Sequence, residues 1–427
     1  MNDIDLDRRA ISNFRTYLQF PTVHPDPDYS ACVEWLRSQA TELGLTFTVI
    51  HFVTNNPIVV MGWEGKEPSL PSILLNSHMD VVPVDKSRWT HPPFAADIDD
   101  DGKIFARGSQ DMKCVGMQQL EAVRRLKARG TTQLRRTVYL SFVPDEELGG
   151  KRGMEPFVEG RPSLKQDPPT KLTFSELNVG FCLDEGLVSA TNDYEAFYDE
   201  RRYCWFIAHF HGVAGHGLSL LEGTAGEKLT CFLQRVANLR SAEKDRLDRS
   251  NGNLTLGDVT SVNLTMLAGG SQPNVLPSTL SAWFDVRLPP SVSLSAWKDQ
   301  LNQWAEEAGG GIEFEYVTTA PDTWEAAPIP DEKTCPFWST LTKVCQRFGA
   351  DVSKRIFPGA TDSRFVRQFH RTANAAPGCR RIQAIGFTPI RRTPVLLHDH
   401  DEYVTEEEFL NGCRLYTELL YDLSELP

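Results

Sequence analysis

Acidic and histidine side chains gather in short motifs that are spread along most of the chain. These motifs are His78-Met-Asp80, Asp111-Met-Lys113, Asp145-Glu146-Glu147, Asp184-Glu185-Gly186 and His398-Asp-His-Asp-Glu402. The first four follow apolar, strand-like runs, so their side chains are expected to meet at one end of a sheet. Imidazole nitrogens and carboxylate oxygens are ligands for divalent transition metals. The pattern therefore favours a metal site that is assembled from distant segments.

The first motif has the residue types of a metal ligand and its supporting partner. In an extended segment His78 and Asp80 point to the same side, and a ligating imidazole commonly donates its other ring N–H to a carboxylate. We therefore expect Asp80 to fix the tautomer of His78. The pair taken alone is also compatible with a hydrogen-bonded histidine at a strand end.

The run Asp145-Glu146-Glu147 places like charges side by side, which repel one another unless cations or solvent relieve them. Taken alone, it is equally compatible with a solvated acidic turn. In the functional interpretation one acid binds metal while its neighbour transfers protons. With Asp111, Glu185 and two histidines, the donor set suits a pair of zinc ions about 3.5–4 Å apart. Cobalt or manganese could substitute for zinc.

The elements that would position these motifs alternate between apolar runs and amphipathic helical stretches. This pattern is typical of an α/β domain with a mainly parallel sheet flanked by helices. We predict helices over residues 30–43 and 112–129, and strands over residues 58–61, 72–77, 137–144 and 179–184. Open α/β sheets bind ligands beyond the carboxyl ends of their strands, and the acidic motifs are expected at those ends.

A separate unit is expected from residue 203 to residue 318. It has the β-α-β-β-α-β order of a ferredoxin-like fold, over residues 203–210, 224–245, 261–267, 280–288, 293–308 and 312–317. Residues 280–288 alternate between apolar and polar types, which indicates a sheet with one buried face. We therefore predict a catalytic domain in two parts, residues 1–202 and 319–427, interrupted by an inserted domain.

Composition narrows the function classes. The 427 residues carry a net charge of −13 without a basic run, which argues against nucleic acid or an anionic membrane as the main partner. The nine cysteines lack any CxxC pair and are expected to be reduced, mostly core thiols. The N-terminus lacks the features of a secretory signal, and no run of eighteen apolar residues occurs. These features predict a cytoplasmic protein.

Three further segments have simpler interpretations. Residues 97–102 begin like a calcium-binding loop, but Gly108 stands where such a loop needs glutamate. We predict a tight acidic turn between two short strands there. Residues 160–176 and 371–381 are interpreted as surface insertions.

Longer stretches resemble the family of two-zinc metallopeptidases that includes aminoacylases, glutamate carboxypeptidases, desuccinylases and dipeptidases. The similarity runs in the same order from about residue 10 to residue 420, and the aminoacylase branch is most similar in HMDVVPV, RGSQDMK, PDEE and LLHDHDE. The resemblance implies a zinc exopeptidase-like catalytic domain with an inserted domain that serves as lid and dimer interface. It also implies a homodimer.

The resemblance further implies two zinc sites that share one ligand. One site would be formed by His78, Asp111 and Glu185, and the other by Asp111, Glu147 and His398. His398 is expected rather than His400, because the family's ligand stands four residues before a glutamate, here Glu402. A cis peptide bond after Asp111 is also implied.

The catalytic roles implied by the resemblance belong to three residues. Asp80 would orient His78, Glu146 would be the general base, and His216 would donate to the oxyanion in the partner subunit's site. The segment around His216 departs from the family's Gly-Arg-Pro-Gly-His-Ala-Ser, because it reads Gly-Val-Ala-Gly-His-Gly-Leu-Ser. Without the resemblance, His216 would be interpreted as an ordinary loop histidine.

The implied substrate is an N-acyl-L-amino acid, with a short acyl group on an apolar residue. Arg364 in GATDSR would bind its carboxylate, and Asn274 in NVLP would reach it from the lid. By residue type alone, the two would be a surface salt-bridge arginine and a capping asparagine. Two alternatives remain: a dipeptidase or carboxypeptidase that uses the same zincs, and a catalytically silent binding paralogue. The intact metal positions and Glu146 weigh against the second alternative.

Overall fold

The computed structural model describes residues 2–169, 171–321, 324–375 and 379–427, and these residues form two units. The first unit contains Met1–Tyr198, Pro328–Lys354 and Thr361–Pro427. The second contains Asp199–Ala327 and Arg355–Ala360. Each unit has its own hydrophobic core.

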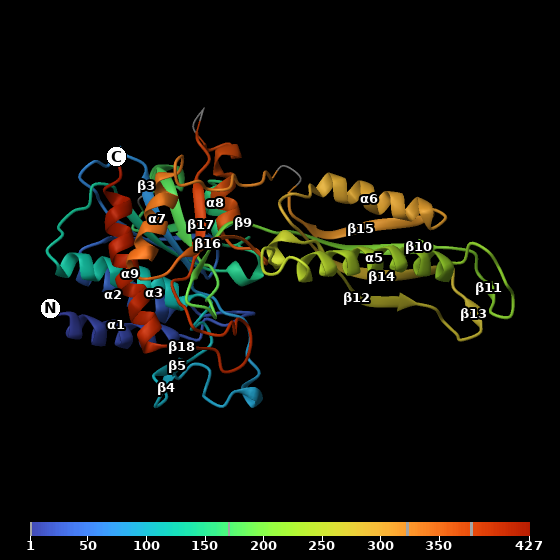
Figure 1. Ribbon diagram of the computed structural model, residues 1–427, viewed down its shortest axis with the longest axis horizontal. Helices are drawn as coiled ribbons and strands as arrows, with labels where there is room; N and C mark the ends of the chain where they lie inside the picture. The colour runs from blue at the N-terminus through green and yellow to red at the C-terminus, as the bar shows by residue number, and fades with distance from the viewer. Residues whose placement is uncertain (1, 170, 322–323, 376–378) are drawn as a thin grey trace. The chain divides into compact units, whose positions relative to one another are not determined.

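The first unit is organised around a mixed sheet with the strand order β16-β9-β17-β8-β3-β6-β2-β1-β7 (Figure 1). Its central strands β17, β8, β3 and β6 are parallel, and the pairs toward β7 and β9 are antiparallel. The strands are β1 (Thr46–Val53), β2 (Asn56–Trp63), β3 (Ser72–His78), β6 (Val138–Val143), β7 (Lys165–Asp167), β8 (Val179–Asp184), β9 (Tyr194–Glu200), β16 (Val352–Phe357) and β17 (Gln383–Phe387). The predicted α/β fold and its predicted strands are confirmed, with small shifts at the strand ends.

Helix α3 (Lys113–Ala128) connects the sheet to the helical layer. It packs against β3 and β6, while α1 (Asp3–Leu18) and α9 (Glu406–Ser424) pack against α3. Gly116 permits the close approach to β3, because a Cβ atom added there would lie 2.8 Å from Ser77 Oγ. The predicted helix over residues 30–43 is confirmed as α2 (Ser30–Leu43), which ends at Gly44 in a left-handed conformation (φ 61°). Helix α7 (Pro336–Arg347) contacts α9, and the short helices α4 (Met154–Val158) and α8 (Ser363–Gln368) contact each other.

Two predictions about individual segments were wrong. Asp111 does not follow a strand of the central sheet: it precedes α3, in a turn after β5 (Lys103–Phe105) of a small separate sheet. Residues 165–167, placed in a surface insertion, form β7 and extend the central sheet, because their backbone pairs with β1. The predicted acidic turn is confirmed between β4 (Asp97–Ile98) and β5. Part of the predicted loop 371–381, residues 376–378, lies outside the described residues.

The second unit has the predicted β-α-β-β-α-β order. Its sheet, β12-β14-β10-β15, is covered on one face by two helices (Figure 1). The elements are β10 (Arg202–His211), α5 (Ala225–Asp248), β12 (Ser261–Gly269), β14 (Thr279–Leu288), α6 (Leu294–Glu307) and β15 (Ile312–Thr319). Alternate residues such as Ala282, Phe284 and Val286 face the core with Phe232 of α5 and Trp297 of α6. A short two-stranded antiparallel ribbon, formed by β11 (Gly215–His216) and β13 (Val275–Leu276), extends from this unit.

Two composition-based expectations can be compared with the structure. All nine cysteines of the sequence are free, and seven of them are buried, as expected of reduced core thiols. Among the described residues, no helix has both the length and the apolar character needed to cross a bilayer.

Candidate metal centre

Three adjacent parallel strands deliver acidic and histidine side chains to one edge of the sheet. His78 is the last residue of β3, Glu185 follows β8, and the Glu146-Glu147 turn follows β6. Asp111 reaches the same place from the N-terminal end of α3, because α3 lies directly against β3. The strands and the helix therefore bring together motifs that are far apart in the sequence.

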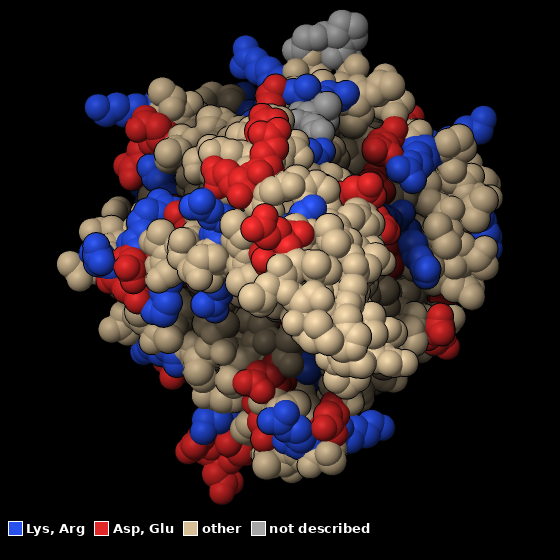
Figure 2. All heavy atoms as spheres, turned by 90° about the vertical axis from the view of Figure 1, so that its right-hand side faces the viewer, with Lys and Arg blue, Asp and Glu red and all other residues tan. Residues whose placement is uncertain are grey.

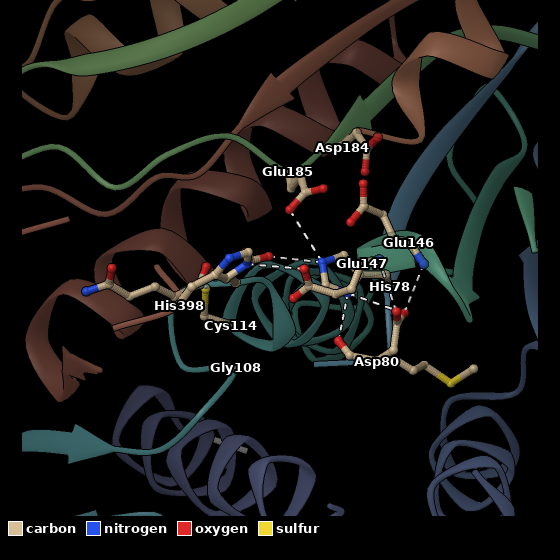
Figure 3. Close-up of polar contacts among 12 residues, drawn as sticks. His78, Asp80, Gly108, Cys114, Glu146, Glu147, Asp184, Glu185 and His398 are labelled. Carbon is tan, nitrogen blue, oxygen red and sulfur yellow. Dashed lines mark hydrogen bonds and ion pairs between the residues drawn. The ribbon is translucent and has the colours of Figure 1, made fainter. Parts of the chain in front are cut away.

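The assembled side chains form two trios that share Asp111; Figure 3 labels the other four members. In the first trio, His78 Nε2 lies 3.0 Å from Asp111 Oδ1 and 3.5 Å from Glu185 Oε2. In the second, His398 Nε2 lies 3.2 Å from Asp111 Oδ2 and 3.1 Å from Glu147 Oε2. The ligand atoms of each trio all lie within 4.8 Å of one another. Asp111 thus presents one carboxylate oxygen to each trio, which is the geometry of a bridging ligand.

The trios differ in their access to solvent. The side chains of His78 and Glu185 are 0% and 6% exposed, whereas the His398 side chain is 54% exposed. His400 belongs to neither trio. The peptide bond between Asp111 and Met112 is cis, as the resemblance implied. The second trio is therefore the side from which a small molecule could approach.

The charges of the site influence one another strongly. Burial raises the pKa of Glu146, Glu147 and Glu185, and neighbouring carboxylates raise it further. Burial opposes ionisation of Asp111 as well, but hydrogen bonds from the two histidines outweigh it and hold the pKa of Asp111 below its usual range. The pKa of His398 is raised to about 10 by hydrogen bonds to Asp111 and Glu147. The two imidazoles thus stabilise the negative charge of Asp111, whereas the crowded, buried glutamates resist ionisation.

Asp80 supports the site differently from the sequence expectation. The nearest acceptor for His78 Nδ1 is the backbone oxygen of Asp80 at 2.9 Å, and the Asp80 carboxylate lies farther away, at 3.6 Å. The carboxylate instead accepts hydrogen bonds from the backbone amides of Glu146 (3.2 Å) and Glu147 (3.1 Å). Asp80 therefore contacts the His78 ring and the Glu146-Glu147 turn at once (Figure 3).

A buried ion pair connects the loops that carry Asp111 and His398. Glu402 accepts hydrogen bonds from the Gln110 amide (2.6 Å), the Asp111 amide (3.3 Å) and Arg107 Nη1 (2.7 Å). Arg107 also donates to the backbone oxygen of His398 at 3.3 Å. Sequence reasoning had used Glu402 only as a spacing marker and had missed Arg107. The contact spans 295 residues, so no local pattern could reveal it.

The remaining predicted site residues lie in two places. Arg364 is buried at the start of α8 in the first unit, close to the turn that follows Glu147: a Cβ atom added to Gly149 would lie 3.9 Å from its Nη2. His216 and Asn274 lie at the exposed β11–β13 ribbon of the second unit, where the Gly217 amide donates to the Asn274 backbone oxygen at 2.8 Å.

His24 was missed altogether by sequence reasoning. Its Nε2 lies 2.8 Å from Asp80 Oδ2, and both side chains are buried. The hydrogen bond to Asp80 raises the pKa of His24, which burial opposes. His24 lies 56 positions before Asp80, outside every motif, so the sequence contains no pattern that would have found it.

Comparison with known proteins agrees with this architecture. The sequence pattern of peptidase family M20/M25/M40 matches residues 74–422, which include all the site residues described above except His24. The chain belongs to this family. Members of the M20 family share its fold: a solved structure from Bacillus subtilis, the YXEP protein, described as a dinuclear metal binding peptidase, superposes with a TM-score of 0.66 at 15% identity and covers 99% of both chains.

Within the M20/M25/M40 family, the similarity to one branch extends along the whole chain. Aminoacylase-1 of Mus musculus is 44% identical over 425 residues, which cover 100% of this chain and 98% of the relative. A probable carboxypeptidase S-like protein of Dictyostelium discoideum is 26% identical over 333 residues, which cover 71% of this chain and 64% of that protein. The aminoacylase branch is therefore favoured by both identity and coverage.

Proposed function

We propose that this protein is a metal-dependent amidohydrolase that cleaves N-acyl-L-amino acids to a free L-amino acid and a carboxylate. The observation that carries the proposal is the pair of ligand trios sharing Asp111, in a chain that is 44% identical to an aminoacylase-1 along its full length. Peptidases of the family are related less closely in sequence.

The donor set fits a pair of divalent metal ions. Each trio directs one imidazole nitrogen at two carboxylates, and the buried Oε1 atom of Glu147 has no hydrogen-bond partner among the described residues. We propose two zinc ions per subunit, one held by His78, Asp111 and Glu185 and one by Asp111, Glu147 and His398, with cobalt or manganese as substitutes. Bound zinc would lower the pKa of a water molecule and polarise the acyl carbonyl.

Glu146 is the residue that we assign as general base. It is 9% exposed and belongs to neither trio, so its carboxylate is not committed to metal. Burial and the charge of Glu185 raise its pKa, which favours uptake of a proton by this carboxylate. Glu146 would take a proton from the attacking water and pass it to the leaving amine. Asp80 would keep the Glu146 backbone in place through the 3.2 Å hydrogen bond.

Three further residues would recognise the substrate and the reacting carbonyl. We propose that Arg364 binds the substrate carboxylate, because a guanidinium can donate two parallel hydrogen bonds to it. Asn274 would contact the substrate from the inserted domain. His216 would donate a hydrogen bond to the developing oxyanion. The exposed position of His216 and Asn274 at the same β11–β13 ribbon supports a joint role for these two residues.

We also propose that residues 203–318 are an inserted lid and dimerisation domain, between catalytic segments 1–202 and 319–427. Strand β12 is at the edge of its sheet and exposes Leu264, Met266 and Leu267, as a strand that pairs with another chain would. The β11–β13 ribbon also exposes apolar residues, and Figure 2 shows few charged side chains over it. These features support a homodimer, and the free cysteines fit a cytoplasmic location.

One experiment tests the central proposal. Metal content and hydrolysis of N-acetyl-L-methionine are measured before chelation, after chelation and after zinc is returned. Near two zinc ions per chain, with activity that falls and recovers, supports an aminoacylase. Hydrolysis of the dipeptide Ala-His in place of N-acetyl-methionine would support the peptidase alternative, and bound zinc without turnover of either substrate would support a silent paralogue.

A further inference from the structure

A short extended segment near the N-terminus runs beside the segment that carries Asp80. The Val81 amide donates to the Thr22 backbone oxygen at 2.9 Å, and the His24 amide donates to the Val81 backbone oxygen at 3.2 Å. Val23 and Val81 form a parallel bridge, and the Thr22 hydroxyl donates to the Met79 backbone oxygen. These contacts fix the register between the two segments, so the position of His24 next to Asp80 is set by the backbone.

The contact between the two side chains is short and buried. His24 is 7% exposed and Asp80 is 0% exposed, with 2.8 Å between Nε2 and Oδ2. Nε2 donates to Asp80 in the imidazolium and in the neutral tautomer that carries Nε2–H. His24 is the side-chain partner nearest to a carboxylate that otherwise accepts hydrogen bonds from backbone amides.

We propose that His24 is a positioning residue for the hydrolytic site: its Nε2–H holds the Asp80 carboxylate, which in turn holds the Glu146-Glu147 turn. This inference rests on the proposed function, because it assigns the turn a general base and a metal ligand. Asp80 Oδ2 accepts from both His24 and the Glu147 amide, so rotation of the carboxylate after loss of His24 would disturb the turn directly. His24 touches neither substrate nor metal in this scheme.

The central test compares two substitutions of His24. His24→Gln keeps an N–H donor at nearly the same reach, whereas His24→Leu fills the space without a donor. We expect His24→Leu to lower kcat by about 10- to 100-fold, the range found for outer-shell partners of metal ligands, and to weaken metal affinity. His24→Gln is expected to stay within about 3-fold of the wild type for both quantities, and KM should change little in either variant.

A matched control separates this role from general packing. His51 lines the same surface cavity of about 750 Å³ as His24, and it is half-buried on β1. His51→Leu is therefore expected to leave kcat and metal affinity unchanged. Thermal unfolding of the metal-free proteins verifies that the variants fold. If His24→Leu fails to fold, His24→Asn replaces it. The asparagine side chain is one methylene shorter than that of glutamine, so its amide is too short to donate to Asp80 as the amide of His24→Gln would.

A double-mutant cycle with Asp80→Ala tests whether His24 acts through Asp80. If it does, His24→Leu should cause little further loss in the Asp80→Ala protein, because Asp80→Ala has already removed the acceptor of the His24 hydrogen bond. Equal losses in both backgrounds would overturn the inference, and so would a His24→Leu protein with kcat and metal affinity within about 3-fold of the wild type.

Metal affinity is measured by competition with a chelator and does not require turnover. If the wild-type protein lacks metal-dependent hydrolysis, the proposed function fails. The coupling between His24 and Asp80 in metal affinity still decides whether His24 positions the site.

Discussion

Replacing Asp80 by asparagine measures how much its buried carboxylate contributes to the site. Among the described residues, all three of its hydrogen-bond partners at 3.2 Å or less are N–H donors: Oδ2 accepts from His24 and the Glu147 amide, and Oδ1 accepts from the Glu146 amide. An asparagine side chain has one acceptor oxygen and one NH₂ group. Whichever way the amide turns, its NH₂ group must face at least one of these donors.

The orientation that loses least keeps the amide oxygen toward His24 and Glu147 and turns the NH₂ group toward the Glu146 amide. One hydrogen bond to a charged acceptor is then lost, which corresponds to about 1.5–3 kcal/mol. At 1.36 kcal/mol for each factor of ten, this is about a 10- to 150-fold effect. Because the turn carries both the proposed base and a metal ligand, we expect kcat and metal affinity each to decrease by a factor in this range.

The assay combines steady-state hydrolysis of N-acetyl-L-methionine at saturating zinc with chelator competition for the metal. Asp85→Asn is the matched control, because Asp85 is exposed and, within the described part of the chain, its carboxylate accepts hydrogen bonds only from nearby Ser87. We expect Asp85→Asn to behave as the wild type does. An Asp80→Asn protein whose kcat and metal affinity both remain within about 3-fold of the wild type would refute the assignment of Asp80 as a support of the turn.

Four other outcomes are expected. Glu146→Gln should retain metal but lose about 100- to 10,000-fold in kcat, whereas Glu159→Gln, an exposed control, should remain active. Full activity of the Glu146→Gln protein would exclude Glu146 as the base. Because the pKa of the metal-free His398 is raised to about 10, its imidazole must lose a proton to bind metal, so metal affinity should fall on acidification. Calorimetry in buffers of different ionisation enthalpy measures the proton release, and metal binding without proton release at neutral pH would contradict this expectation. Arg364→Lys should raise KM by about 10-fold or more with little change in kcat, since lysine lacks the bidentate geometry; an unchanged KM argues against carboxylate binding. Leu267→Asp on β12 should shift the protein toward monomers in sedimentation velocity, and an unaltered dimer places the interface elsewhere.

Local patterns in the sequence predicted most of the elements that carry the site. Strands β3, β6 and β8 are short apolar runs, and helix α2 spans the predicted residues, because periodicity and helix-ending residues act within a few positions. The alternation along β14 likewise predicted a sheet in the second unit with one covered face. These predictions succeeded because the apolar residues of a buried strand or helix face repeat in the sequence with the period of that element.

Contacts between distant segments were harder to predict from the sequence. Asp111 was expected at a strand end, but it reaches the site because Gly116 lets α3 pack closely on β3. The contact between Asp80 and the Glu146-Glu147 turn depends on the parallel neighbours β3 and β6. Strand order is decided by packing energy summed over the whole sheet, and no local pattern records it.

Sequence information specified the donor types, the elements that carry them and, through resemblance, the grouping of the ligands around a shared Asp111. The folded chain adds two contacts that no sequence pattern indicated: Glu402 and Arg107 join two loops, and His24 contacts Asp80. The difference lies in the range of the interactions. Backbone propensity and hydrophobic periodicity act over a few residues, whereas a buried charge finds its partners by position in the folded chain, at any separation in sequence.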